Sequence, residues 1–165
     1  MAKPISTIGR VMGFLSLMAF TFPSGKLLFS DAQYCNNRFD YCLDYPNSLL
    51  PDRYLSPQSD TLLLKSVGQI AEVSVMGKLG KTGSTPERVF EKNLQFIISK
   101  NGKATVISTL FGEDFYEANF LCGDFTYQQK AAFSETRSAL FTIKVPVNRP
   151  ELMVRLKADL DFIYE

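Results

Sequence analysis

The sequence predicts an α+β protein, with one antiparallel β-sheet of about six to seven strands and two helices packed on it. Seven stretches alternate apolar and polar residues as strands do, whereas only two show the three- and four-residue apolar spacing of helices. The last four strand-like stretches follow one another without an intervening helix, and a parallel β-α-β fold would need regular alternation. Short turns join them, which favours antiparallel neighbours. The expected element order is β-β-β-α-β-β-β-β-α.

The N-terminal segment is predicted to be a signal peptide. Lys3 and Arg10 make it basic, and the twelve residues 11–22 that follow carry no charge before Pro23 interrupts them. An uncharged run of that length is shorter than the roughly 20 apolar residues that a membrane-spanning helix needs. We therefore expect export, and no integral membrane span in the mature chain.

The predicted cleavage site follows Ala32, because Ser30 and Ala32 place small residues at the −3 and −1 positions. Cleavage there divides the chain into a signal peptide at 1–32 and a single α+β domain at 33–165. The mature protein is expected to be periplasmic or secreted.

Three strands are expected before the first helix, at 38–45, 61–66 and 70–76. Residues 46–60 contain three prolines and are interpreted as a loop. The first strand places its large apolar side chains on one face, and the last two form a hairpin. The apolar face of the first strand comprises Phe39, Tyr41, Leu43 and Tyr45.

A glycine-rich stretch at 77–83 precedes the first predicted helix. Thr85 or Ser84 is its expected N-cap, Pro86 suits its first turn, and Glu87 completes a capping box. The helix is expected to end at Asn101-Gly102. Its apolar stripe comprises Val89, Phe90, Leu94, Ile97 and Ile98.

Four more strands are expected at 103–110, 114–122, 124–133 and 137–146. A second helix is expected to follow them and close the chain, with Asn148 as its N-cap. Its apolar stripe comprises Leu152, Leu156, Leu160 and Ile163.

Export changes how the three cysteines are interpreted, because oxidising compartments permit disulfides. A Cys35–Cys42 disulfide is preferred, with Asn36-Asn37 turning the chain back over the strand at 38–45. The objection is that a fully extended segment would hold the two too far apart. A Cys35–Cys122 pair and three free thiols are the alternatives.

The opening strand, with aromatic residues leading into Tyr45-Pro46, is similar to the start of PsbP-like domains. The element order over 38–165 also resembles that family. The resemblance implies an α/β/α sandwich with an antiparallel central sheet. The family includes an extrinsic photosystem subunit and many small exported bacterial proteins of unknown activity, and its members are mostly non-enzymatic binding or assembly factors. No functional residue is carried over from it, since fold alone does not define function.

The composition excludes several kinds of chemistry. The chain has no His, so Ser-His and Cys-His nucleophile pairs and His-liganded zinc sites cannot form. The 18 Lys and Arg residues are balanced by 17 Asp and Glu residues, so the chain lacks the excess of positive charge that is typical of nucleic-acid-binding proteins. We therefore expect no nucleic-acid partner, no cofactor, no metal site and no catalytic residue. One candidate ligand or partner surface is aromatic, and it comprises Tyr116, Phe120, Phe125 and Tyr127.

We expect an exported, non-enzymatic binding or assembly protein of the bacterial envelope, with a protein or an envelope component as its partner. A periplasmic immunity protein that inhibits a toxic effector is one alternative. A small His-independent enzyme is another, and it would need two converging carboxylates. The acidic residues Glu113, Asp114 and Glu117 lie around a turn, where surface charge is the commoner interpretation.

Overall fold

The computed structural model describes residues 32–58, 60–80 and 83–164, which form ten strands and two α-helices in two antiparallel sheets. The predicted signal peptide at 1–32 lies outside the described residues except for Ala32, the first residue of β1. The elements are β1 (Ala32–Asn36), β2 (Tyr41–Tyr45), β3 (Asp52–Leu55), β4 (Thr61–Lys65), β5 (Glu72–Leu79), α1 (Pro86–Asn101), β6 (Ala104–Phe111), β7 (Phe115–Cys122), β8 (Phe125–Phe133), β9 (Arg137–Pro146), α2 (Pro150–Asp159) and β10 (Asp161–Tyr164).

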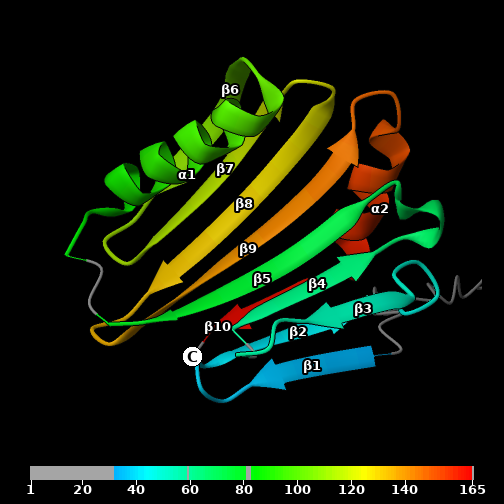
Figure 1. Ribbon diagram of the computed structural model, residues 1–165. Coiled ribbons are helices and arrows are strands. Elements are labelled where there is room, and N and C mark those ends of the chain that lie inside the picture. The colour runs from blue at the N-terminus through cyan, green and yellow to red at the C-terminus, as the bar shows by residue number, and fades with distance from the viewer. Residues whose placement is uncertain (1–31, 59, 81–82, 165) are drawn as a thin grey trace, which may run out of the picture.

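The larger sheet has seven strands in the order β3-β4-β5-β9-β8-β7-β6 (Figure 1). Two runs of hairpins build it, β3 to β5 before α1 and β6 to β9 after it. The two runs meet where β5 pairs with β9 along its whole length, with Val73 opposite Ile143 and Leu79 opposite Arg137. This central pairing joins residues that are 58 to 72 positions apart in the chain, so it depends on tertiary contacts and not on a turn.

The smaller sheet has three strands in the order β1-β2-β10. β2 is its central strand, and its buried residues alternate as expected, with Tyr41, Leu43 and Tyr45 facing inward. β10, near the C-terminal end of the chain, pairs with β2 in an antiparallel arrangement and places Phe162 opposite Leu43. The two ends of the described chain therefore lie on either side of β2.

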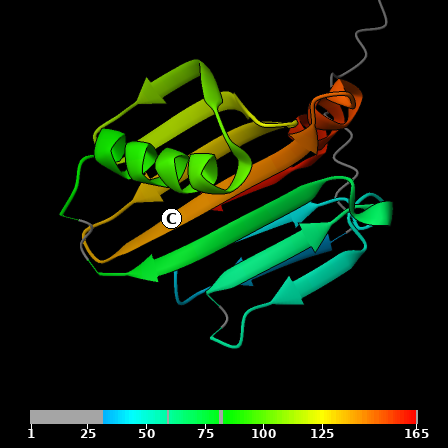
Figure 2. The same ribbon diagram turned by 45° about the horizontal axis from the view of Figure 1, so that its top comes forward.

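Each face of the larger sheet is covered by different elements. The three-stranded sheet and α2 pack on the face that carries Val73 and Val75 of β5 and Phe141 and Ile143 of β9, which forms the first core. α1 lies on the opposite face, over β6, β7 and β8, where Phe90 contacts the second core (Figure 2). The two helices therefore lie on opposite faces of the sheet, as the resemblance to PsbP-like domains implied.

The predicted limits of α1 are confirmed. Thr85 is the N-cap residue, Pro86 occupies the first turn, and Gly102 takes a positive φ of 93° as the chain leaves the helix. Hydrogen bonding to Thr85 holds the pKa of Glu87 below its usual value. The predicted capping residues thus lie together at the start of the helix.

The α+β class and the antiparallel sheet with two helices are confirmed, but several predicted elements differ. The loop predicted at 46–60 contains β3, and the predicted terminal helix stops at Asp159 because 161–164 form β10. The first strand belongs to the smaller sheet and is shorter than 38–45, since Asp40 lies in the preceding turn. The N-cap of α2 is Arg149 and not Asn148, because Pro150 occupies the first helical position.

Neither helix within the described parts of the chain combines the length and the apolar character needed to cross a bilayer.

Candidate functional site

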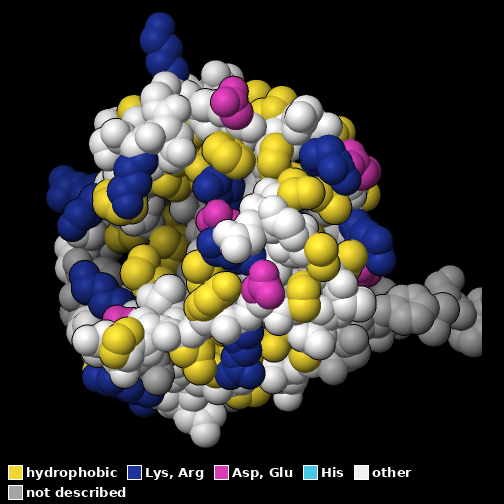
Figure 3. Space-filling model, turned by 45° about the vertical axis from the view of Figure 1, so that its right-hand side comes forward, with side chains coloured by type: hydrophobic (Ala, Val, Ile, Leu, Met, Phe, Trp, Pro, Cys, Tyr) yellow, Lys and Arg dark blue, Asp and Glu magenta, His cyan; other side chains and the backbone are white. Residues whose placement is uncertain are grey.

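A groove runs between α1 and the uncovered part of the sheet face beside it. It consists of two adjoining cavities of about 230 and 410 Å³, and Met76, Asn93 and Leu140 line both of them. We call the two cavities together the α1 groove. Figure 3 shows a hollowed face with hydrophobic side chains inside the hollow and Lys or Arg side chains around it.

The groove exists because α1 is too narrow to cover the whole sheet. The helix covers β6 to β8, whereas β5 and β9 extend beyond it (Figure 2). Strand alternation sends apolar side chains of β5 and β9 into the core on the other face and leaves Ser74, Met76, Leu140 and Thr142 on the groove side.

A hydrogen-bonded chain of side chains links α1 to the groove floor. The Asn93 amide donates to the Tyr116 hydroxyl at 3.0 Å, and that hydroxyl donates to Oε1 of Gln129 at 3.2 Å. The Gln129 amide in turn donates to Oγ1 of Thr142 at 3.3 Å. Gln129 is only 2% exposed, so these bonds satisfy a polar group that would otherwise be costly to bury. The network fixes the spacing between the helix and the floor.

Burial also changes the titration of tyrosines in this protein. It raises the pKa of Tyr116 to about 12, with the hydrogen bond from Asn93 acting in the opposite direction. It likewise raises the pKa of Tyr127, which lines the smaller cavity, and of Tyr41 in the other core to about 12. All three hydroxyls are therefore neutral at physiological pH.

One end of the groove carries a cluster of positive charge. Lys78 from β5 and Arg88 and Lys92 from α1 line the larger cavity and are exposed. We call these three residues the cation cluster. Among the described residues that line this cavity, only Asp60 is acidic. A hydrogen bond from Ser56 holds the pKa of the Asp60 carboxyl group below the usual value. The cavity therefore has a net positive charge.

The other end of the groove is electrically balanced. The Lys144 ammonium lies 3.7 Å from Oε1 of Glu72 and 4.2 Å from the centre of the Phe125 ring. Apolar side chains separate this pair from the cation cluster, and Phe96 is the most exposed of them at 60%. The groove thus combines a positive end, an apolar middle and a polar floor.

The predicted aromatic surface is not an exposed platform. Tyr116 and Phe120 are fully buried and pack edge-on against Phe90 of α1, so they belong to the second core. Tyr127 stacks on Phe120 with ring centres 5.0 Å apart, and its edge reaches the groove. Their even spacing on β7 and β8 places these rings on one face of the sheet. The sequence did not show that α1 would cover this face.

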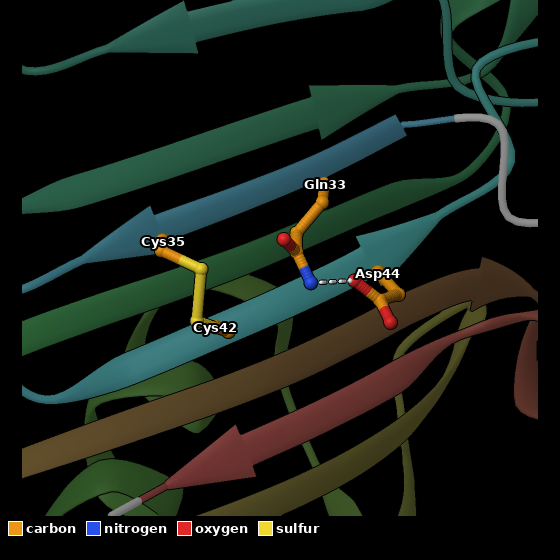
Figure 4. Close-up of a disulfide and its surroundings, with 4 residues drawn as sticks. All are labelled: Gln33, Cys35, Cys42 and Asp44. Carbon is orange, nitrogen blue, oxygen red and sulfur yellow. Dashed lines mark hydrogen bonds between the residues drawn. A yellow bond between two sulfur atoms is a disulfide. The ribbon is translucent and has the colours of Figure 1, made fainter.

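The structure joins Cys35 and Cys42 in a disulfide (Figure 4), whereas Cys122 is a buried free thiol. The two half-cystines are direct partners across the β1-β2 hairpin, with Cα atoms 4.1 Å apart. The turn at 37–40 removes the geometric objection to this pair, because the segment between the cysteines is a hairpin and not an extended strand. Gln33 donates to Asp44 at 2.7 Å beside the disulfide.

Of the acidic residues considered for catalysis, Glu117 is paired with a basic residue, since its Oε1 lies 3.1 Å from the Lys130 ammonium. Among the described residues, no three His, Cys, Asp or Glu side chains are close enough to hold a metal ion together.

The cation cluster was not predicted from the sequence. Lys78 is the penultimate residue of β5, while Arg88 and Lys92 lie one helical turn apart on α1. The spacing of Arg88 and Lys92 could have indicated a basic stripe on the helix. Nothing local could have shown that Lys78 faces the same cavity.

Comparisons with solved structures identify this arrangement of strands and helices. The solution structure of cyanobacterial PsbP (CyanoP) from Synechocystis sp. PCC 6803 matches with a TM-score of 0.59 and 11% sequence identity, over 80% of this chain and 92% of that chain. The chain has a PsbP-like fold. At this level of identity the match shows the architecture alone.

A crystal structure from Bacteroides thetaiotaomicron VPI-5482 matches more weakly, with a TM-score of 0.44 and 10% identity over 82% of this chain and 50% of that chain. No protein-family model and no curated protein matches the sequence.

Proposed function

We propose that this PsbP-like chain is an exported, non-enzymatic binding or assembly protein of the bacterial envelope, and that its partner binds in the α1 groove. The observation that carries the proposal is the groove itself, which is open, has a net positive end and presents exposed apolar side chains beside a polar floor. Protein-binding surfaces commonly combine apolar anchors with a charged rim. The partner is a protein or another envelope component.

Export is supported by the N-terminal pattern of the sequence and by the Cys35–Cys42 disulfide, since disulfides persist in oxidising compartments. Cleavage after Ala32 would leave Gln33 to Asn36 in β1, so the disulfide and the hairpin would remain in the mature protein. Mass spectrometry of the protein from a periplasmic fraction should find a chain that begins at Gln33. Full-length chain confined to the cytosol would contradict export.

Site-specific photocrosslinking tests whether the groove is the binding site. A benzoylphenylalanine residue replaces Phe96 in the groove or Val154 on the exposed side of α2, and both positions are well exposed at 60% and 69%. Irradiation of intact cells should give a specific adduct from position 96 and not from position 154. Equal adducts from both positions would contradict the groove as the site.

A further inference from the structure

The α1 groove has a chemical asymmetry that restricts what it can hold. At its positive end Lys78, Arg88 and Lys92 outnumber Asp60, whereas at the other end Lys144 is balanced by Glu72. A ligand with an acidic group at one end therefore has a favoured orientation, with that group at the cation cluster.

The middle of the groove favours apolar groups. Met76 from β5, Leu140 from β9 and Ile97 from α1 line it together, and Phe96 stands at its edge. Met76 is 47% exposed although it lies in the centre of a strand, so a ligand at this position would cover apolar surface that now faces water.

The polar side chains of the groove floor discriminate between two classes of anionic ligand, lipids and acidic peptides. An acyl chain lying along the groove would cover the Ser74 and Thr142 hydroxyl groups and the side-chain carbonyl of Asn93 without offering them hydrogen bonds, which is unfavourable. An extended polypeptide carries backbone donors and acceptors that can meet hydroxyl and amide groups while its side chains contact the apolar residues. The polar floor therefore favours a peptide over a lipid.

From these features we infer that the α1 groove binds an extended segment of a partner polypeptide, with Asp or Glu side chains at the cation cluster and an apolar side chain over Met76 and Leu140. The inference deepens the proposed function and rests on it. The bound segment would lie along β5 and β9 with α1 as its outer wall.

A random peptide library displayed on phage provides the probe. The full chain is purified from an expressing cell and immobilised, and the enriched peptides are sequenced. We expect a consensus that contains both acidic and apolar residues. A fluorescein-labelled consensus peptide is then titrated by fluorescence anisotropy. Enrichment of basic peptides, or the absence of any consensus, would overturn the inference.

Charge reversal in the groove tests the orientation. The triple variant Lys78→Glu, Arg88→Glu, Lys92→Glu should weaken binding of the consensus peptide by roughly tenfold or more. The single-site control Lys103→Glu reverses one exposed charge in the turn after α1, outside both groove cavities, and should bind like the wild type. Equal affinity of the triple variant and the wild type would overturn the inference.

The variant Asp60→Asn tests the same electrostatic effect, but here tighter binding is expected. Damage to the fold would weaken binding and so could not produce this result. The substitution removes the acidic charge from the larger cavity, and the amide oxygen can still accept from Ser56. The consensus peptide should bind more tightly by a few-fold, and the gain should shrink as salt is added. Weaker or unchanged binding would contradict the proposed role of charge.

Two further experiments distinguish the acidic-peptide inference from a lipid ligand and from a partner that binds without the cation cluster. Vesicles of phosphatidylglycerol and phosphatidylcholine should not compete with the labelled peptide, and effective competition would favour a lipid. If the partner crosslinked at position 96 binds the triple variant as well as it binds the wild type, the proposed binding function stands and the acidic-peptide inference fails.

Discussion

The contact between Gly77 and Phe39 gives the sharpest stability prediction. Gly77 lies in β5 opposite Ala139, on the face covered by the smaller sheet. A Cβ atom added at Gly77 would lie 2.2 Å from Cγ, 2.4 Å from Cδ2 and 2.7 Å from Cβ of Phe39. Phe39 is 2% exposed, so its ring has little room to move away. Gly77→Ala should therefore overpack this part of the first core.

The expected cost follows from the size of the overlap. An ordinary Cβ contact is at least about 3.4 Å, so the added carbon would force a shift of roughly 1 Å in a close-packed region, and overpacking of this kind costs about 1–3 kcal/mol. The intrinsic effect has the opposite sign, because Ala in an unstrained strand is more stable than Gly by about 0.4–1 kcal/mol. We expect a net loss of about 2 kcal/mol in the free energy of unfolding.

Urea denaturation of a double-mutant cycle isolates the clash. Phe39→Ala alone should cost about 3–5 kcal/mol through loss of a buried ring. Gly77→Ala made in the Phe39→Ala background should cost much less than in the wild type, because the ring atoms Cγ and Cδ2 are gone and only the Cβ at position 39, 2.7 Å away, remains to be displaced. Ser74→Ala, on the groove side of the same strand, is the control and should change stability by less than about 0.5 kcal/mol. An equally large Gly77→Ala cost with and without the Phe39 ring would refute the reasoning.

Three further predictions concern the disulfide, the tyrosines and the buried amide. Removing the Cys35–Cys42 disulfide should cost about 2.5 kcal/mol by the loop-entropy relation for a short loop, measured by denaturation with and without reductant. Stability should fall above pH 10, because the unfolded state releases the Tyr116 proton near pH 10 while the folded state holds it to about pH 12. The slope is about 1.4 kcal/mol per pH unit for each such tyrosine, followed by denaturation from pH 8 to 12. Gln129→Ala should cost about 1–3 kcal/mol by leaving the Tyr116 hydroxyl without its acceptor, whereas Gln128→Ala on the other face of β8 should cost far less.

Each of these predictions has an outcome that contradicts it. Labelling of the denatured, unreduced protein should find one thiol, and three thiols would mean that Cys35 and Cys42 are not joined. Constant stability from pH 9 to pH 12 would show that the tyrosines titrate alike in both states. Equal costs at positions 128 and 129 would show that the hydrogen bonds of Gln129 do not matter.

Six of the seven strands of the larger sheet could be predicted, because strand alternation is local. Residues 115–122, 125–133 and 137–146 alternate regularly and are separated by short turns, and the structure places β7, β8 and β9 there. The limits of α1 could likewise be predicted, because Thr85-Pro86 marks the start of the helix and Gly102 marks its end.

The three missed strands lack such a local pattern. β3 and β10 have only four residues each, and β10 follows α2 at a spacing that also suits a helix. β1 lies where the predicted signal peptide ends. Their conformations depend on pairing with β4 and β2, which are partners that alternation does not identify.

The candidate site follows the same division. Composition excluded His-dependent chemistry, and the Asn36-Asn37 turn made Cys35–Cys42 the preferred disulfide in spite of the objection from an extended spacing. The aromatic residues of β7 and β8 were correctly placed on alternating positions, but their burial required knowledge of where α1 packs. The groove beside α1 appears only when the helix and β5 are placed in space.

The amino-acid pattern established the class of the fold and the limits of its longer elements, because these depend on interactions within a few residues of each other. Long-range packing decided the rest. It set β5 beside β9, placed α1 on one face and the three-stranded sheet on the other, and brought Lys78 to the same cavity as Arg88 and Lys92. A binding site made from a strand and a helix on different parts of the chain arises from that packing, which no local pattern of residues encodes.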